Sequence, residues 1–197
     1  TKIGFITGEV MVVVVVNGRK LPHSDILTDM MRDGIPELRS LILNVNTRKS
    51  SVILGEENIL LWGKESIRDY IGSLEFQISP LSFFQVNPIQ TEKLYEKALE
   101  YAGLTGKELV LDAYCGIGTI SLFLARKAAK VIGVELVNQA ILDAERNAEL
   151  NRIRNVDFIA GAVEQVVPQL LEQGIQPDVV VLDPPRKGCD ETVLDTI

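Results

Sequence analysis

Residues 109–119 read LVLDAYCGIGT, and this stretch decides the fold. Leu109–Asp112 is an apolar run ending in an acid, which predicts a buried strand. Gly116 and Gly118 then allow a tight turn and let a ligand lie close to the backbone, while the following helix would offer free N–H groups. Dinucleotide-binding turns carry a third glycine, and Ser121 stands in its place, which weakens a dinucleotide interpretation.

The chain after Pro80 alternates between strand and helix patterns. Continuous apolar strands separated by helices indicate a parallel sheet covered on both faces, so residues 81–197 are predicted to form an α/β, Rossmann-like domain. In its first helix, apolar residues at helical spacing share one face, beginning with Leu94. The expected strands are Leu109–Asp112, Val131–Val134, Val156–Ile159 and Asp178–Leu182, and the expected helices are Thr91–Ala102, Ile120–Ala129, Val137–Ala148 and Val163–Gln173.

Residues 1–80 are predicted to form a separate, small α+β segment dominated by strands. Ser51–Leu54 and Ile59–Trp62 flank the turn-forming stretch Gly55–Asn58, which predicts a hairpin. A helix is expected over Ser24–Arg32, with Ser24 or Asp25 as its N-cap. Further strands are expected at Met11–Asn17, Leu38–Asn46 and Leu74–Ile78.

The residues that end the predicted strands point to a cofactor, because parallel sheets bind ligands at the carboxyl ends of their strands. Glu135 ends the second strand, 19 residues after Gly116, where a carboxylate can accept hydrogen bonds from ribose hydroxyls. Asp183 ends the fourth strand, and Pro184 and Pro185 after it stiffen the exit. An acid followed by two prolines is typical of methyltransferases. The combination predicts a class I S-adenosylmethionine-dependent methyltransferase domain.

The chain resembles the bacterial RNA uracil-5-methyltransferases, especially their 23S ribosomal RNA branch. The resemblance rests on SFFQVN at 82–87, residues 112–119, Val134-Glu135 and residues 183–188, and it extends over most of the chain. It implies S-adenosylmethionine as cofactor and RNA as partner, with ribosomal RNA expected first and transfer RNA as the alternative. The site residues it implies are Gln85 at the methionine part of the cofactor, Tyr114 and Thr119 beside the cofactor, Glu135 at the ribose, and Asp183 between cofactor and target uracil.

In this family a cysteine thiolate adds to carbon 6 of uracil, which activates carbon 5 for methylation. The resemblance places this cysteine and a glutamate base beyond Ile197, so we expect a truncated fragment without catalytic residues of its own. Cys189, near Arg186 and Lys187, is a weaker local candidate. Cys115 is expected to be packed inside the turn. By residue type alone, Phe83 and Phe84 would be core residues.

Composition argues against several classes of protein. The net charge is −7, with 9 basic and 10 acidic residues in positions 1–75 and 11 basic and 17 acidic residues afterwards. Neither half is therefore a basic RNA-binding module, and any large phosphate-binding surface must lie elsewhere. The longest apolar run, Val10–Val16, is too short to span a membrane. Two cysteines and the single His23, expected in a loop or at the surface, predict neither a disulfide scaffold nor a metal site, so a cytoplasmic location is expected.

Two alternatives remain open. An exocyclic-amine methyltransferase acting on RNA or DNA would carry an aromatic residue after the two prolines, where Arg186 stands here. A catalytically inert module that binds only the cofactor, RNA or protein is the second alternative. The glycine turn, Glu135 and Asp183 together argue against inertness for the parent protein.

Overall fold

The computed structural model describes residues 1–49 and 52–196. Contacts divide the chain into two compact units. We call Thr1–Tyr70 with Gln77–Leu81 the N-terminal unit, and Ile71–Phe76 with the chain from Ser82 onward the C-terminal unit. Each is described by itself.

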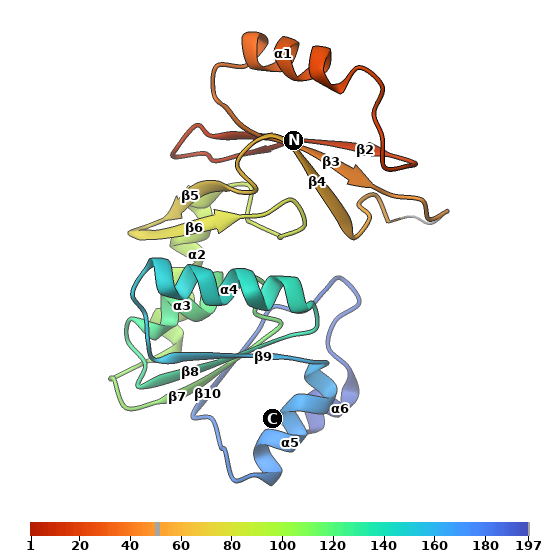
Figure 1. Ribbon diagram of the computed structural model, residues 1–197. Helices are drawn as coiled ribbons and strands as arrows, with labels where there is room; N and C mark the ends of the chain where they lie inside the picture. The colour runs from red at the N-terminus through yellow and green to blue at the C-terminus, as the bar shows by residue number, and fades with distance from the viewer. Residues whose placement is uncertain (50–51, 197) are drawn as a thin grey trace. The chain divides into compact units, whose positions relative to one another are not determined.

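The C-terminal unit is built on a parallel four-stranded sheet (Figure 1). Its strands are β7 (Leu109–Ala113), β8 (Lys130–Glu135), β9 (Val156–Ala160) and β10 (Val179–Leu182), in the order β10-β7-β8-β9. All three pairings are parallel, as predicted, and the bounds agree with the expected strands to within one residue at each end. The carboxyl ends of β7, β8 and β10 therefore meet at one edge, which makes it the place to look for a ligand.

Helices cover both faces of this sheet, which confirms the predicted layers (Figure 1). One apolar cluster joins Leu111 and Val134 to Val167 of α5 and Val193 of α6. The opposite cluster joins Val110 and Val131 to residues of α3. The helices are α2 (Pro88–Ala102), α3 (Thr119–Ala125), α4 (Asn138–Leu150), α5 (Val163–Glu172) and α6 (Glu191–Thr196).

The helix predictions need correction at four points, including the start of α2, which begins at Pro88 rather than at Thr91. Helix α3 stops at Ala125 rather than Ala129, and α6 was not expected. In α2, Leu94 is 62% exposed, whereas the buried residues are Pro88, Thr91 and Tyr95. Only Leu94 departs from the predicted face, since Ala98 and Ala102 are half-buried, and α2 instead packs Tyr95 against the ring of Phe123 in α3. The extra first turn is explained by Asn87, whose side chain accepts the N–H of Gln90 as an N-cap.

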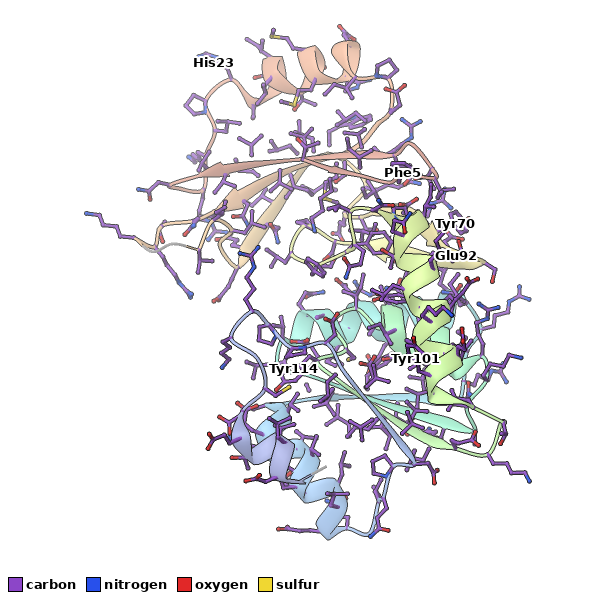
Figure 2. The ribbon with its side chains drawn as sticks, turned by 180° about the vertical axis from the view of Figure 1, so that it is seen from behind. Phe5, His23, Tyr70, Glu92, Tyr101 and Tyr114 are labelled. Carbon is purple, nitrogen blue, oxygen red and sulfur yellow. The ribbon has the colours of Figure 1, made fainter. Side chains whose placement is uncertain are left out.

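The N-terminal unit contains a four-stranded sheet in the order β1-β2-β3-β4 and the helix α1 (Ser24–Gly34). Strands β2 and β3 are parallel and joined through α1, while β1 and β4 are antiparallel edge strands. His23, exposed and with a left-handed backbone, occupies the N-cap position without a side-chain hydrogen bond, so the predicted cap at Ser24 or Asp25 is wrong (Figure 2). The strands are β1 (Lys2–Ile3), β2 (Val10–Val16), β3 (Leu38–Val45) and β4 (Glu57–Gly63).

The predicted hairpin around Gly55–Asn58 is not formed. Residues 52–54 are not a strand, Ser51 lies outside the described residues, and β4 pairs with β3 instead. The physical reason is that Asn44 in β3 and Asn46 directly after it form hydrogen bonds with this segment. Asn46 donates to the carbonyls of Val52 and Ile53, both at 2.9 Å, and Asn44 bonds both the N–H and the carbonyl of Gly55.

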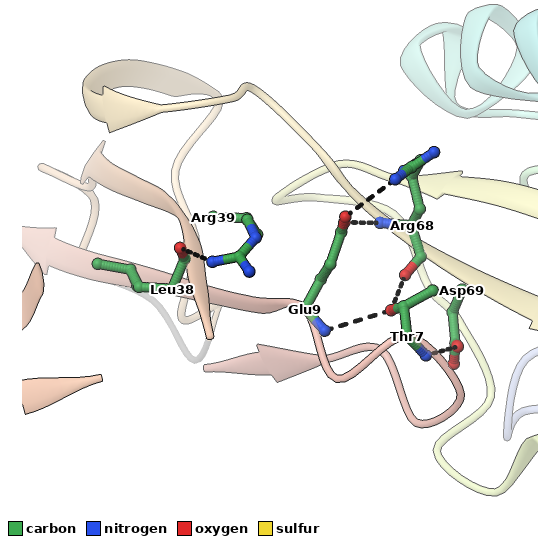
Figure 3. A network of polar contacts seen from close by, with 6 residues as sticks. All are labelled: Thr7, Glu9, Leu38, Arg39, Arg68 and Asp69. Atoms are coloured by element: carbon green, nitrogen blue, oxygen red, sulfur yellow. Dashed lines mark hydrogen bonds and ion pairs between the residues drawn. The ribbon is translucent and has the colours of Figure 1, made fainter. Parts of the chain in front are cut away.

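A second hairpin, β5 (Ile67–Ile71) and β6 (Leu74–Ile78), contributes residues to both units. In the N-terminal unit, Asp69 accepts the N–H of Thr7, and Thr7 donates its hydroxyl to the carbonyl of Arg68 at 2.6 Å (Figure 3). Glu9 accepts the N–H of Arg68 at 2.8 Å and pairs with its guanidinium (Figure 3). These bonds fix β5 to the loop after β1.

In the C-terminal unit, the same hairpin is fixed to the end of α4. Asn151 donates to the carbonyl of Glu75 at 2.7 Å and accepts the N–H of the same residue at 2.9 Å. Phe76 is fully buried in the cluster that includes Tyr95 and Phe123. Among the described residues, no helix combines the length and apolar character needed to cross a membrane.

Candidate functional site

The turn after β7 adopts a conformation that few residues tolerate. Tyr114, Gly116 and Gly118 all have positive φ, at 71°, 55° and 81°. A Cβ on Gly118 would stand 2.9 Å from the ring of Phe158, so only glycine fits between the turn and β9. A left-handed non-glycine residue such as Tyr114 costs of order 1–3 kcal/mol and is typical of functional sites.

Glu135 holds this turn from the end of β8. One carboxylate oxygen accepts the N–H of Gly116 at 3.1 Å, and the other accepts the N–H of Val137 at 3.0 Å. The side chain is half-buried. Each carboxylate oxygen has a second lone pair, so Glu135 retains the capacity to accept ligand hydroxyl groups.

Asp112 is a site residue that sequence reasoning did not single out. It lies in β7, is fully buried, and accepts a hydrogen bond from the hydroxyl of Ser121 in α3. Burial raises its pKa to about 7, and the negative charges of Asp183 and Glu135 act in the same direction. The available signal was an acid within an apolar strand, four residues before the first glycine of the turn.

Thr119 begins α3, and its hydroxyl is 2.9 Å from the hydroxyl of Tyr95 in α2. Burial raises the pKa of Tyr95 to about 12, with smaller contributions from the charges of Asp112 and Asp183. Tyr95 was also missed, because only the packing of α2 against α3 brings it to this edge.

Asp183 is exposed and follows β10 directly. Because its charge raises the pKa of Asp112 and of Tyr95, it lies in the same electrostatic cluster. The structure thus connects four of the predicted site residues. Glu135 accepts a hydrogen bond from the turn that contains Tyr114. Thr119 contacts Tyr95 through its hydroxyl, and the charge of Asp183 acts on both Tyr95 and Asp112. We call these residues, with Tyr95 and Asp112, the strand-end cluster.

Gln85 lies in the irregular segment before α2 and is half-buried. Among the described contacts none joins it to the strand-end cluster, so its role stays a prediction. Its neighbour Phe84 packs against Phe76, with ring centroids 5.8 Å apart. Phe83 is 73% exposed, which corrects the expectation of a core position. Phe84 thus packs against the apolar cluster that contains Phe76, whereas the neighbouring Phe83 faces solvent.

The two cysteines have different surroundings. Cys115 is buried, as expected, and burial raises the pKa of its thiol, which makes it a poor nucleophile. Cys189 is half-buried and close enough to Tyr114 to contribute, after burial, to the raised pKa of that phenol.

The chain is similar to known RNA methyltransferases over nearly its whole length. An uncharacterized RNA methyltransferase of Clostridium tetani is 56% identical over 98% of this chain and 42% of its own length. Another from Caldanaerobacter subterraneus is 54% identical over 100% of this chain and 43% of its length. The chain therefore spans less than half of the curated relatives it matches.

A solved structure is also similar. The tRNA (uracil-54, C5)-methyltransferase of Pyrococcus abyssi, in complex with S-adenosyl-L-homocysteine, has a TM-score of 0.77 and 32% identity over 99% of this chain and 45% of that chain. This likeness confirms the predicted class I methyltransferase fold. A sequence profile described as tRNA (Uracil-5-)-methyltransferase matches residues 25–197. Because that match covers most of the chain, the chain belongs to the tRNA (uracil-5-)-methyltransferase family.

Proposed function

We propose that this chain binds S-adenosylmethionine at the strand-end cluster and that its parent protein methylates carbon 5 of a uridine in RNA. The observation that carries the proposal is the cluster itself, in which Glu135 fixes a glycine turn beside Asp112 and Asp183. Membership of the uracil-5-methyltransferase family favours carbon 5 of uracil over an exocyclic amine.

The residues present fit such a cofactor. A Cβ added to Gly116 would meet no atom within 4 Å, so the backbone of the turn is open to a ligand. The cofactor carries sulfonium, ammonium and carboxylate groups, so its net charge is positive, and the acids of the cluster complement that net charge. The resemblance to the family assigns Gln85 to the methionine part, Glu135 to the ribose, and Asp183 to the space between cofactor and uracil.

The cofactor supplies the methyl group, and the protein must activate the uracil. Activation requires a thiolate at carbon 6, a role for which the buried Cys115 is unsuited. The resemblance to the family places the nucleophile and the base in a part of the parent protein outside residues 1–197. The target base would have to be unstacked before it reaches the cofactor.

We propose ribosomal RNA as the substrate class, because SFFQVN at 82–87 and the segment at 183–188 resemble the ribosomal branch. Transfer RNA is the second candidate, since the matching family profile and the similar Pyrococcus abyssi enzyme are both named for transfer RNA. Methylation assays of the parent protein on the two purified RNA classes distinguish them. Methylation of transfer RNA alone would reject the ribosomal assignment.

Cofactor binding tests the assignment of the site. Glu135→Ala removes the acceptor for two ribose hydroxyls, and hydrogen bonds to a charged group contribute roughly 1.5–3 kcal/mol. We expect calorimetry to show at least about a tenfold loss of S-adenosylmethionine affinity. The matched control is Glu145→Ala, which removes an exposed glutamate of α4 and should leave affinity unchanged. Equal affinity in both variants would exclude Glu135, and preferential binding of NAD would overturn the proposed function.

A further inference from the structure

Asp112 has a feature that the cofactor-binding role of the other residues does not explain. Its side chain is fully buried. One oxygen, Oδ2, accepts the hydroxyl of Ser121, but among the described residues Oδ1 has no hydrogen-bond partner. A buried polar atom without a partner is costly and calls for an explanation, all the more when it belongs to a carboxylate that can ionise.

The groups around Asp112 make its ionised form more costly still. Glu135 from the end of β8 and Asp183 after β10 are both acids, and both raise its pKa. Tyr95 from α2 and Cys115 from the turn face it as neutral groups, whose own ionisation Asp112 opposes. Ser121 alone favours the carboxylate, mainly through the hydrogen bond from its hydroxyl and to a smaller extent through its backbone N–H. A positive charge brought next to Asp112 would therefore favour its ionised form.

We propose that Asp112 holds a proton while no ligand is bound and releases it when a cationic cofactor binds, so that cofactor binding is coupled to proton release. This inference rests on the proposed function. The O–H bond of the Asp112 carboxyl group breaks, the proton passes to solvent, and the remaining carboxylate faces the positive charge that the ligand brings. Asp112 thus acts as a positioning residue that adjusts the charge of the site.

The protonation of Asp112 should also differ between the cofactor complex and the product complex. Both molecules carry an ammonium group and a carboxylate group, which balance each other, so the sulfonium gives S-adenosylmethionine a net positive charge whereas S-adenosylhomocysteine is neutral overall. The product therefore compensates the three acids less, and Asp112 should take up part of its proton again after methyl transfer. Ionisation of Asp112 at higher pH should then favour the cofactor over the product, because only the cofactor presents the additional positive charge.

Calorimetry of the 197-residue chain in buffers of different ionisation enthalpy counts the released protons directly. With a pKa of about 7 in the free protein, S-adenosylmethionine should release about half a proton per site at a pH of about 7. S-adenosylhomocysteine should release distinctly less. Affinity for S-adenosylmethionine should rise with pH below about 7, by at most about tenfold per pH unit, and level off above it.

Variants assign the proton to Asp112. Asp112→Asn cannot ionise, so proton release should disappear. Ser121→Ala removes the bond that favours the carboxylate and should move the pH dependence upward, which provides a test if the first variant folds poorly. The matched control is Asp143→Asn, which alters a buried acid of α4 that interacts with Gln139 and Arg146. This control should release protons as the unmodified chain does.

The outcomes separate the two proposals. Proton-free binding of S-adenosylmethionine by the unmodified chain, or unchanged proton release in Asp112→Asn, would overturn the role of Asp112 and leave the proposed function standing. No binding of S-adenosylmethionine in any buffer would overturn the proposed function and this inference with it.

Discussion

Asp112 lies in a buried position where an ionised carboxylate is energetically unfavourable, and its neighbours determine how unfavourable it is. Burial, Asp183 and Glu135 all oppose ionisation of Asp112, while the hydroxyl and the backbone N–H of Ser121 stabilise the ionised form. A protonated carboxyl group avoids most of this cost, because a neutral group loses far less hydration on burial than an ion. The same residue therefore links the stability of the C-terminal unit to pH.

The sign of that link follows from the direction of the shift. The folded pKa of Asp112, about 7, is above the ordinary value of 3.8, so the folded state binds more protons between these values and loses stability as pH rises through them. Asp112→Asn lacks this penalty. We expect the free energy of unfolding of the variant, relative to the unmodified chain, to increase between pH about 4 and about 7, by at most about 4 kcal/mol.

Urea unfolding followed by hydrogen exchange of β7 measures this difference in the C-terminal unit. Asp143→Asn serves again as the buried-acid control. A difference between Asp112→Asn and the unmodified chain that stays constant with pH would show that Asp112 is ionised throughout this range.

At the scale of elements, continuous apolar runs predicted the four strands of the parallel sheet because both faces of that sheet are covered. Such strands can be predicted without knowing which elements pack against them. The buried face of a helix cannot: Leu94 has the apolar character and spacing of a core residue, yet Tyr95 is the buried residue. The segment at residues 52–55 was hard to predict for the same reason, since its conformation depends on hydrogen bonds from Asn44 and Asn46.

Asn44 shows how strongly one side chain can determine an element. It is fully buried in β3, its amide donates to the carbonyls of Gly55 and Glu57, and its oxygen accepts the N–H of Gly55. Asn44→Ala leaves these backbone groups without partners, so we expect the N-terminal unit to lose roughly 2–4 kcal/mol of stability. Trp62, the single tryptophan, lies in β4, so its fluorescence reports unfolding of this unit.

Asn46→Ala is the comparison for that prediction, because Asn46 is only half-buried and water can replace its bonds to Val52 and Ile53. We expect a loss of about 1 kcal/mol or less. A smaller loss for Asn44→Ala than for Asn46→Ala would show that burial is not what makes the asparagine bonds of β3 important.

At the scale of the whole chain, the site was predictable to the extent that it depends on strand ends. Glu135, Asp183 and the turn at Tyr114 follow from topology, because residues after parallel strands meet at one edge. Asp112 and Tyr95 depend on burial and on how α2 packs, which spacing does not reveal. Gln85 came from family resemblance alone, and its role still awaits a measurement.

The surroundings of the two thiols bear on whether residues 1–197 can transfer a methyl group. Carbon 5 of uracil is too weak a nucleophile to attack a sulfonium until a thiolate adds at carbon 6. The two thiols present are Cys115, whose pKa is raised by burial, and the half-buried Cys189. The resemblance to the family assigns the role of nucleophile to neither thiol, so we expect no methyl transfer by this chain, even when it is saturated with cofactor and RNA.

An RNA carrying 5-fluorouridine tests this directly. Fluorine at carbon 5 cannot leave as a proton, so a competent cysteine stays attached to the RNA after methyl transfer. The parent protein should form this covalent adduct with radiolabelled cofactor, and residues 1–197 should not. Cys189→Ser is the decisive control, because Cys189 lies near Tyr114 at the edge of the site. An adduct that forms with the unmodified chain and disappears in Cys189→Ser would make Cys189 the nucleophile and the chain catalytically complete.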